Sequence, residues 1–138
     1  MMTIRRQEIV KLENVLHLYQ AVGWTNYTNQ SQMLAQTLTH SLAIYLAHDG
    51  EEIVGLVRLV GDGFSSVFIQ DLIVLPSYQR QGIGSNLMKE ALGDFKDAYQ
   101  VQLATEQTEK TLGFYRSLGF ETLSTYDCTG MIWVNRKK

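Results

Sequence analysis

The chain has 138 residues, which is the size of one domain with a single core and too short for two ordinary domains. Its hydrophobic fraction of 45% and charged fraction of 19% are typical of a soluble globular protein, and a formal net charge of −2 gives no reason to expect nucleic acid as a partner. No apolar run approaches the roughly 20 residues that a membrane-spanning helix needs, and the N-terminus has no apolar segment of the secretory type. The single cysteine, Cys128, cannot form an internal disulfide, so a reduced cytoplasmic protein is expected.

Residues that commonly bind metals show no pattern in this sequence. Cys128 and the three histidines, His17, His40 and His48, lack the spacing of metal ligands, so no metal site is expected. Cys128 is expected to be a small packing residue rather than a nucleophile.

Hydrophobic periodicity and turn residues predict a mixed α/β chain with the element order β-α-α-β-β-β-α-β-α-β-β. Apolar residues at helical spacing predict helices, and alternating or continuous apolar runs between glycine-containing turns predict strands. Pro76 cannot donate to a strand ladder and is expected to end the longest strand. The expected helices are 7–22, 32–41, 82–98 and 108–118, and the expected strands are 3–6, 43–48, 53–60, 66–75, 101–105, 120–126 and 131–135, the last two forming a hairpin.

The most informative segment joins the longest strand to the following helix and reads Gln79-Arg80-Gln81-Gly82-Ile83-Gly84. Glycine lets a backbone approach a ligand closely, and the first turn of a helix leaves N–H groups without intrahelical partners. The helix dipole adds partial positive charge at this point, and Arg80 adds a full one. This combination predicts an anion site, most often one for phosphate.

Two common phosphate loops are excluded by the residues that follow. A P-loop needs Lys and then Ser or Thr after its last glycine, but Ser85 and Asn86 follow Gly84. The dinucleotide fingerprint needs Gly or Ala where this chain has Leu87. A plain turn with a tight packing contact is the alternative that the glycines alone leave open.

The segment from Val67 to Met88 resembles the acyl-CoA-binding motif of the GNAT superfamily of N-acetyltransferases, whose core is Gln/Arg-x-x-Gly-x-Gly/Ala between a strand and a helix. A second block, Phe114 to Phe120, is similar to the family's Phe-Tyr-x-x-x-Gly-Phe signature. The two blocks stand in the family's order, and the element order extends the resemblance over nearly the whole chain. The resemblance implies one GNAT-like domain over residues 1–138, with a central mixed sheet of about seven strands and about four helices on its faces.

The implied activity is that of an acetyl-CoA-dependent N-acetyltransferase, an acyltransferase that needs no metal. It would transfer an acetyl group directly, in a ternary complex, to a primary amine of a small molecule or peptide. In the family, the unpaired backbone of the long strand binds the pantetheine arm of the donor and the glycine loop binds its pyrophosphate. The residues implied to contact acetyl-CoA are Leu72, Ile73, Val74, Gln79, Arg80, Gln81, Gly82, Ile83, Gly84, Ser85 and Phe114.

Tyr115 matches the family tyrosine that is proposed to protonate the departing thiolate. A phenol with a pKa of about 10 is protonated at neutral pH and can act as a general acid. Tyr115 could instead be an aromatic residue that packs against Phe114 and Phe120.

The general base is open. Some relatives carry a Glu on the long strand where this chain has Phe68, which leaves Asp71 and Glu106 as acidic candidates. Either carboxylate could equally be a structural acceptor of hydrogen bonds. A water relay, or capture of the small unprotonated fraction of the amine, is an equally good alternative.

The acceptor side is expected to include Trp24, Tyr27 and Tyr78, although the two loop aromatics Trp24 and Tyr27 could equally be packing residues. An alternative function is a non-catalytic acyl-CoA-binding module that acts as a sensor or regulatory subunit. Many family members pair through their C-terminal strands, which leaves a homodimer open.

Overall fold

The computed structural model describes residues 1–135, which group into two compact units, Met1–Ala104 and the part from Thr105 onward. The first unit begins with a strand and three helices and continues with a hairpin, a further strand, a helix and a last strand. Its elements are β1 (Met2–Arg6), α1 (Leu12–Ala21), α2 (Thr25–Thr28), α3 (Ser31–Thr39), β2 (Ala43–Asp49), β3 (Glu52–Gly61), β4 (Ser66–Val74), the 3-10 helix η1 (Pro76–Tyr78), α4 (Ile83–Asp94) and β5 (Gln100–Leu103). The second unit contains α5 (Glu109–Ser117) and the 3-10 helix η2 (Leu123–Tyr126).

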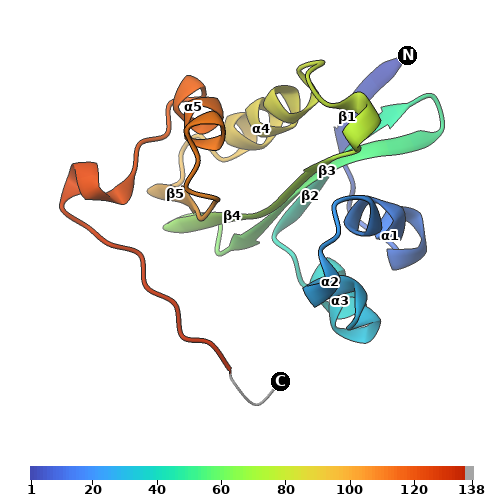
Figure 1. Ribbon diagram of the computed structural model, residues 1–138, viewed down its shortest axis with the longest axis horizontal. Coiled ribbons are helices and arrows are strands. Elements are labelled where there is room, and N and C mark those ends of the chain that lie inside the picture. The colour runs from blue at the N-terminus through green and yellow to red at the C-terminus, as the bar shows by residue number, and fades with distance from the viewer. Residues whose placement is uncertain (136–138) are drawn as a thin grey trace. The chain divides into compact units, whose positions relative to one another are not determined.

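The first unit is built on one five-stranded sheet in the order β1-β2-β3-β4-β5. The first four strands pair antiparallel, and β5 pairs parallel to β4 after the α4 crossover. Helices α1, α2 and α3 cover one face of this sheet and α4 covers the other (Figure 1). The expected mixed sheet with helices on its faces is therefore confirmed.

Each face of the sheet has its own apolar contact with the helices. On the α1–α3 face, a buried cluster joins apolar residues from the three helices to Leu46 on β2, Leu56 on β3 and Ile73 on β4. On the α4 face, Gly55 of β3 lies under the helix. A Cβ at Gly55 would be only 3.1 Å from Leu87 Cδ1, so glycine permits the close approach of α4 to the sheet.

The predicted C-terminal hairpin is wrong for the residues that the structure describes. Residues 123–126 form η2, which ends at Asp127 in the left-handed conformation with φ +57°, and residues 127–135 form no strand. The sheet therefore has five strands within residues 1–135 instead of about seven. Alternating apolar residues predict a strand, but a strand also needs an edge to pair with, and local sequence does not specify that edge.

The predicted helix boundaries shift at the N-terminus. The helix expected over 7–22 begins at Leu12, because residues 7–11 are not helical and Gln7 N–H donates to Ile44 O across the sheet, 2.9 Å apart. The loop expected over 23–30 contains the short helix α2, which raises the number of α-helices in the described chain to five. None of the helices in residues 1–135 is both long and apolar enough to cross a membrane.

Candidate active site

Strand β4 separates from β5 about halfway along its length. Their parallel register runs from Ser66–Gln100 to Ile69–Leu103 and ends there. At the same level, the register of β4 with β3 shifts, because Arg58 pairs with Asp71 and the next residue of β3 pairs with Ile69. Gln70 is therefore the extra residue of a β-bulge, a feature that bends a strand and locally ends pairing. Beyond the bulge, β4 has an edge that no strand in residues 1–135 covers.

The backbone groups at this open edge follow from the alternation of an antiparallel pair. Leu75 N–H donates to Val54 O on β3, 2.9 Å apart, so every second residue back from Leu75 also faces β3. Ile73 is one of these, whereas Leu72 and Val74 present their N–H and C=O to the open edge. Val74 O accepts a hydrogen bond from Gln79 Nε2 at 3.1 Å, in agreement with this direction.

The loop after β4 ends in an uncapped helix N-terminus. Gly82 is the N-cap of α4 with φ +80°, and no side chain within the described chain accepts from the first turn. The first helical bond runs from Asn86 N–H to Gly82 O, which leaves the earlier N–H groups of the turn available. A Cβ added to Gly82 would meet no atom within 4 Å, so the space beside this residue is open.

Arg80 lies two residues before this N-terminus and also has left-handed backbone, with φ +66°. A residue with a Cβ pays about 1–2 kcal/mol for this conformation, and such strain concentrates at functional sites. Its side chain is exposed, so a full positive charge stands beside the positive end of the helix dipole. The turn therefore has the donors, the charge and the space that an anion requires.

Tyr78, expected on the acceptor side, is bonded to the β2–β3 hairpin. Its hydroxyl donates to Asp49 Oδ2 at 2.8 Å, with Glu52 Oε1 at 3.4 Å. The hydrogen bond to Asp49 is the main cause that raises the pKa of Tyr78 to about 12. The contact fixes η1, and with it the start of the glycine loop, to the end of the sheet.

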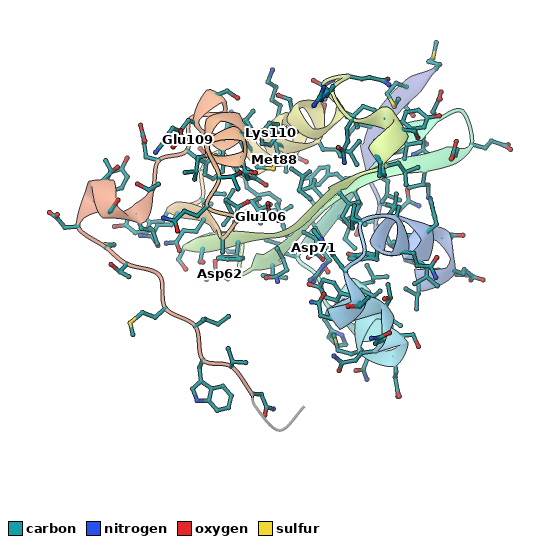
Figure 2. The ribbon with its side chains drawn as sticks, viewed as in Figure 1. Asp62, Asp71, Met88, Glu106, Glu109 and Lys110 are labelled. Atoms are coloured by element: carbon teal, nitrogen blue, oxygen red, sulfur yellow. The ribbon has the colours of Figure 1, made fainter. Side chains whose placement is uncertain are left out.

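Asp71 lies at the centre of a buried polar cluster on the α1–α3 face of the sheet (Figure 2). Its Oδ2 accepts from Arg58 Nε at 2.7 Å and from Tyr19 Oη at 2.9 Å. Its Oδ1 accepts from Tyr27 Oη at 2.9 Å. Arg58 also donates to Tyr27 Oη and to Ser41 Oγ, both at 3.2 Å. The cluster therefore joins β3 and β4 to α1, α2 and the segment that follows α3.

The surroundings of this cluster favour the neutral form of its two phenols and the charged form of its arginine. Burial is the largest cause that raises the pKa of Tyr19 and of Tyr27, and the charge of Asp71 adds to it. Burial by itself would lower the pKa of Arg58, but the charge and hydrogen bond of Asp71 outweigh it and the pKa is raised. Asp71 is 2% exposed and Arg58 is 4% exposed, so the pair is desolvated.

Trp24 and Tyr27, the other residues expected on the acceptor side, pack inside the α1–α3 layer. The Tyr19 ring makes edge contacts with both, at centroid distances of 6.1 Å to Trp24 and 5.1 Å to Tyr27. Tyr27 is buried and Trp24 is partly buried against the core cluster. Their geometry favours the packing alternative.

Sequence reasoning missed Arg58. A signal was present, because Arg58 and Asp71 are single charges of opposite sign within apolar strands that a tight turn makes antiparallel neighbours.

In the second unit, Tyr115 on α5 lies between two phenylalanines. Its ring makes edge contacts with Phe114 at a centroid distance of 4.9 Å and with Phe120 at 6.0 Å. Burial raises the pKa of Tyr115, partly offset by a hydrogen bond with Thr105. Glu106 is exposed in the segment that precedes α5 (Figure 2).

Comparison with known proteins assigns the family. Residues 40–122 match the family model described as "Acetyltransferase (GNAT) domain". A solved GNAT family acetyltransferase from Streptococcus pneumoniae TIGR4 is 79% identical, with a TM-score of 0.91 over 99% of this chain and 99% of that one. "GCN5-related N-acetyltransferase 1, chloroplastic" from Arabidopsis thaliana is 27% identical over 97% of this chain and 68% of its own length.

A more distant solved structure, an aminoglycoside N-acetyltransferase in complex with CoA, shares the fold at 18% identity, with a TM-score of 0.72 over 100% of this chain and 96% of that one. The chain spans about half to two thirds of the length of the curated relatives that it matches first. Since the family model covers more than half of its residues, the chain belongs to the GNAT family of acetyltransferases.

Proposed function

We propose that the protein transfers the acetyl group of acetyl-CoA directly to a primary amine of a small molecule or peptide in a ternary complex. The observation that carries this proposal is the open edge of β4, which leads within a few residues to the uncapped N-terminus of α4. Both features offer backbone hydrogen bonds to one extended ligand that carries amides and phosphates.

The residues of the first unit fit this donor. Leu72 and Val74 would supply the strand-like hydrogen bonds to the amides of the pantetheine arm, as in peptide recognition at a sheet edge. The N–H groups from Gly82 to Ser85 would bind the pyrophosphate, and Arg80 would add charge. The open space beside Gly82 is what a phosphate at this turn needs, since a side chain there would occupy it.

Acetyl-CoA supplies a thioester carbonyl to this chemistry. The amine nitrogen bonds to the carbonyl carbon, the carbon–sulfur bond breaks, the nitrogen loses a proton and the thiolate gains one. We assign the proton donor to Tyr115, whose pKa is raised by burial, so that its phenol stays neutral at physiological pH. Phe114 packs on the ring and holds its orientation.

The proton from the amine requires a different acceptor. Both oxygens of Asp71 already accept hydrogen bonds from Arg58 and two tyrosines, so Asp71 is a poor candidate for the base. Glu106, a water relay, or entry of the amine in its neutral form remains as the route. The pH dependence of the rate, measured with two amines of different pKa, distinguishes these routes. If the pH at which the rate rises shifts with the pKa of the amine, the amine enters in its neutral form. If that pH is the same for both amines, a group of the protein accepts the proton.

The function itself is tested by two measurements on the purified chain. Acetyl-CoA should raise the melting temperature while ATP and NAD do not, because only a ligand of the native state stabilises it. Thiol release from acetyl-CoA should then depend on an added amine from a panel of small amines and peptides. Stabilisation by acetyl-CoA without any amine-dependent release would refute catalysis and favour the non-catalytic module.

We also propose that the protein forms a homodimer through its C-terminal segment. Met131, Ile132, Trp133 and Val134 form an apolar run with exposed fractions of 96, 85, 86 and 57%. A run of this kind marks an interaction site, and extended chain can add to a sheet edge. Light scattering should give a dimer for the wild type and a monomer for Trp133→Ser, whereas Ile9→Ser, at an apolar residue that is also largely exposed (76%), should stay dimeric. A monomeric wild type would exclude this assembly.

A further inference from the structure

We propose that the buried Arg58–Asp71 ion pair is a positioning device for the open edge of β4. The pair would fix the strand directly after the bulge, so that Leu72 and Val74 keep their N–H and C=O turned toward that edge. This inference rests on the proposed function, because it concerns the strand assigned to the pantetheine arm.

The location of the pair carries the argument. Arg58 and Asp71 are partners on the same rung of the β3–β4 ladder, and this rung is the first one after the register shift. Asp71 therefore stands between Gln70, the extra residue of the bulge, and Leu72, the first residue of the open edge. A side chain held at this rung determines the direction in which the unsupported part of β4 continues.

The contacts of Asp71 come from three directions. Arg58 Nε and Tyr19 Oη reach Oδ2, and Tyr27 Oη reaches Oδ1. The donors belong to β3, α1 and α2, so rotation or sliding of this rung would break hydrogen bonds to two different structural layers. On the other edge β5 gives no support past Ile69, so the cluster anchors the strand where its unpaired part begins.

A gain in folding stability does not explain why the protein buries an ion pair here. Desolvation of two charges offsets much of their attraction, and replacing a buried ion pair with apolar residues of similar volume is often neutral or stabilising. The pair, at 2% and 4% exposure, is therefore better explained by the geometry that it specifies.

The test uses the double variant Arg58→Met/Asp71→Leu and two ligands, one with the pantetheine arm and one without it. Acetyl-CoA would contact both the β4 edge and the glycine loop, whereas adenosine 3′,5′-bisphosphate is a nucleotide fragment that lacks the pantetheine arm. Titration calorimetry should show a loss of about tenfold or more in acetyl-CoA affinity, with the affinity for the bisphosphate within about twofold of the wild type. A purely structural role would not separate the two ligands.

Tyr27→Phe provides a milder variant that keeps the ion pair and removes one donor to Asp71, and it carries the test if the double variant does not fold. It should weaken acetyl-CoA binding in the same selective way, by a smaller factor. Tyr45→Phe is the matched control, because the Tyr45 hydroxyl donates to Asp94 Oδ2 at 2.6 Å on α4, away from the cluster. It should change neither affinity.

Unchanged acetyl-CoA affinity in the double variant, or in Tyr27→Phe, would overturn the inference. So would an equal loss for both ligands. If wild-type protein binds acetyl-CoA no more tightly than the bisphosphate, the strand does not bind the pantetheine arm and the inference fails, whereas the proposed function fails only if thiol release does not depend on an amine.

Discussion

Replacing Gly82 with alanine tests directly whether the first turn of α4 binds the phosphates of the donor. Gly82 combines a left-handed φ of +80° with open space on the side where a Cβ would stand. The substitution therefore strains the backbone without a clash inside the protein, and it places a methyl group where a ligand would approach.

The two effects have different sizes. Left-handed backbone costs a residue with a Cβ about 1–2 kcal/mol, which for a chain of this length lowers the melting temperature by about 4–8 °C. Disturbing a hydrogen bond to a charged phosphate costs about 1.5–3 kcal/mol, which corresponds to about 10- to 100-fold in the dissociation constant of acetyl-CoA.

The variant Gly50→Ala separates the loss of stability from the loss of acetyl-CoA affinity. Gly50 also has left-handed backbone, with φ +62°, and a Cβ there would likewise meet no atom within 4 Å. It lies in the turn between β2 and β3, so this variant should lose similar stability and bind acetyl-CoA as the wild type does. Melting curves and titration calorimetry on both variants measure the difference. Equal affinity of Gly82→Ala and Gly50→Ala would refute the assignment of the pyrophosphate to this turn.

Three further substitutions test the site and the fold. Tyr115→Phe should lower kcat by about 100-fold or more and leave acetyl-CoA affinity unchanged, since the phenol acts only on the leaving thiolate; an unchanged kcat would remove Tyr115 from the reaction. Gly55→Ala should destabilise by about 1–3 kcal/mol in denaturant unfolding, because its Cβ would press on Leu87 Cδ1 at 3.1 Å, and wild-type stability would show that α4 can move away. Hydrogen bonds from Ser65 and from backbone N–H groups hold the pKa of Asp62 below its usual range, so its stabilisation is present at neutral pH and disappears as the pH falls through the folded pKa. The melting-temperature difference between wild type and Asp62→Asn should therefore shrink below about pH 4, and a constant difference would contradict this cause.

The parts of the fold that local sequence determines were predictable. Glycine turns and periodicity located the five strands of the sheet and the helix after the glycine loop, each within a few residues. The tight turn at the start of α4 was also predictable, because Gly82 adopts a left-handed backbone conformation that glycine favours.

Features that depend on distant partners were not predictable in the same way. Residues 120–126 and 131–135 alternate like strands, but whether they pair depends on an available edge. Within residues 1–135 this part of the chain forms η2 and irregular chain instead. Tyr27 was expected beside a substrate because the sequence predicted a loop there, yet it lies in α2 and its hydroxyl donates to Asp71, which is 44 residues away in sequence. Side-chain identity alone does not reveal such a contact.

Asp71 shows why residue type and position are insufficient for a catalytic assignment. A carboxylate on the long strand was a reasonable base, but proton affinity that is useful in catalysis requires a lone pair that can reach the substrate. The lone pairs of Asp71 point to an arginine and two phenols, whose own protons are held firmly. On this face of the sheet the side chains of the Asp71 cluster therefore hold the strands and helices together, whereas on the open edge the backbone is what the proposed function assigns to acetyl-CoA.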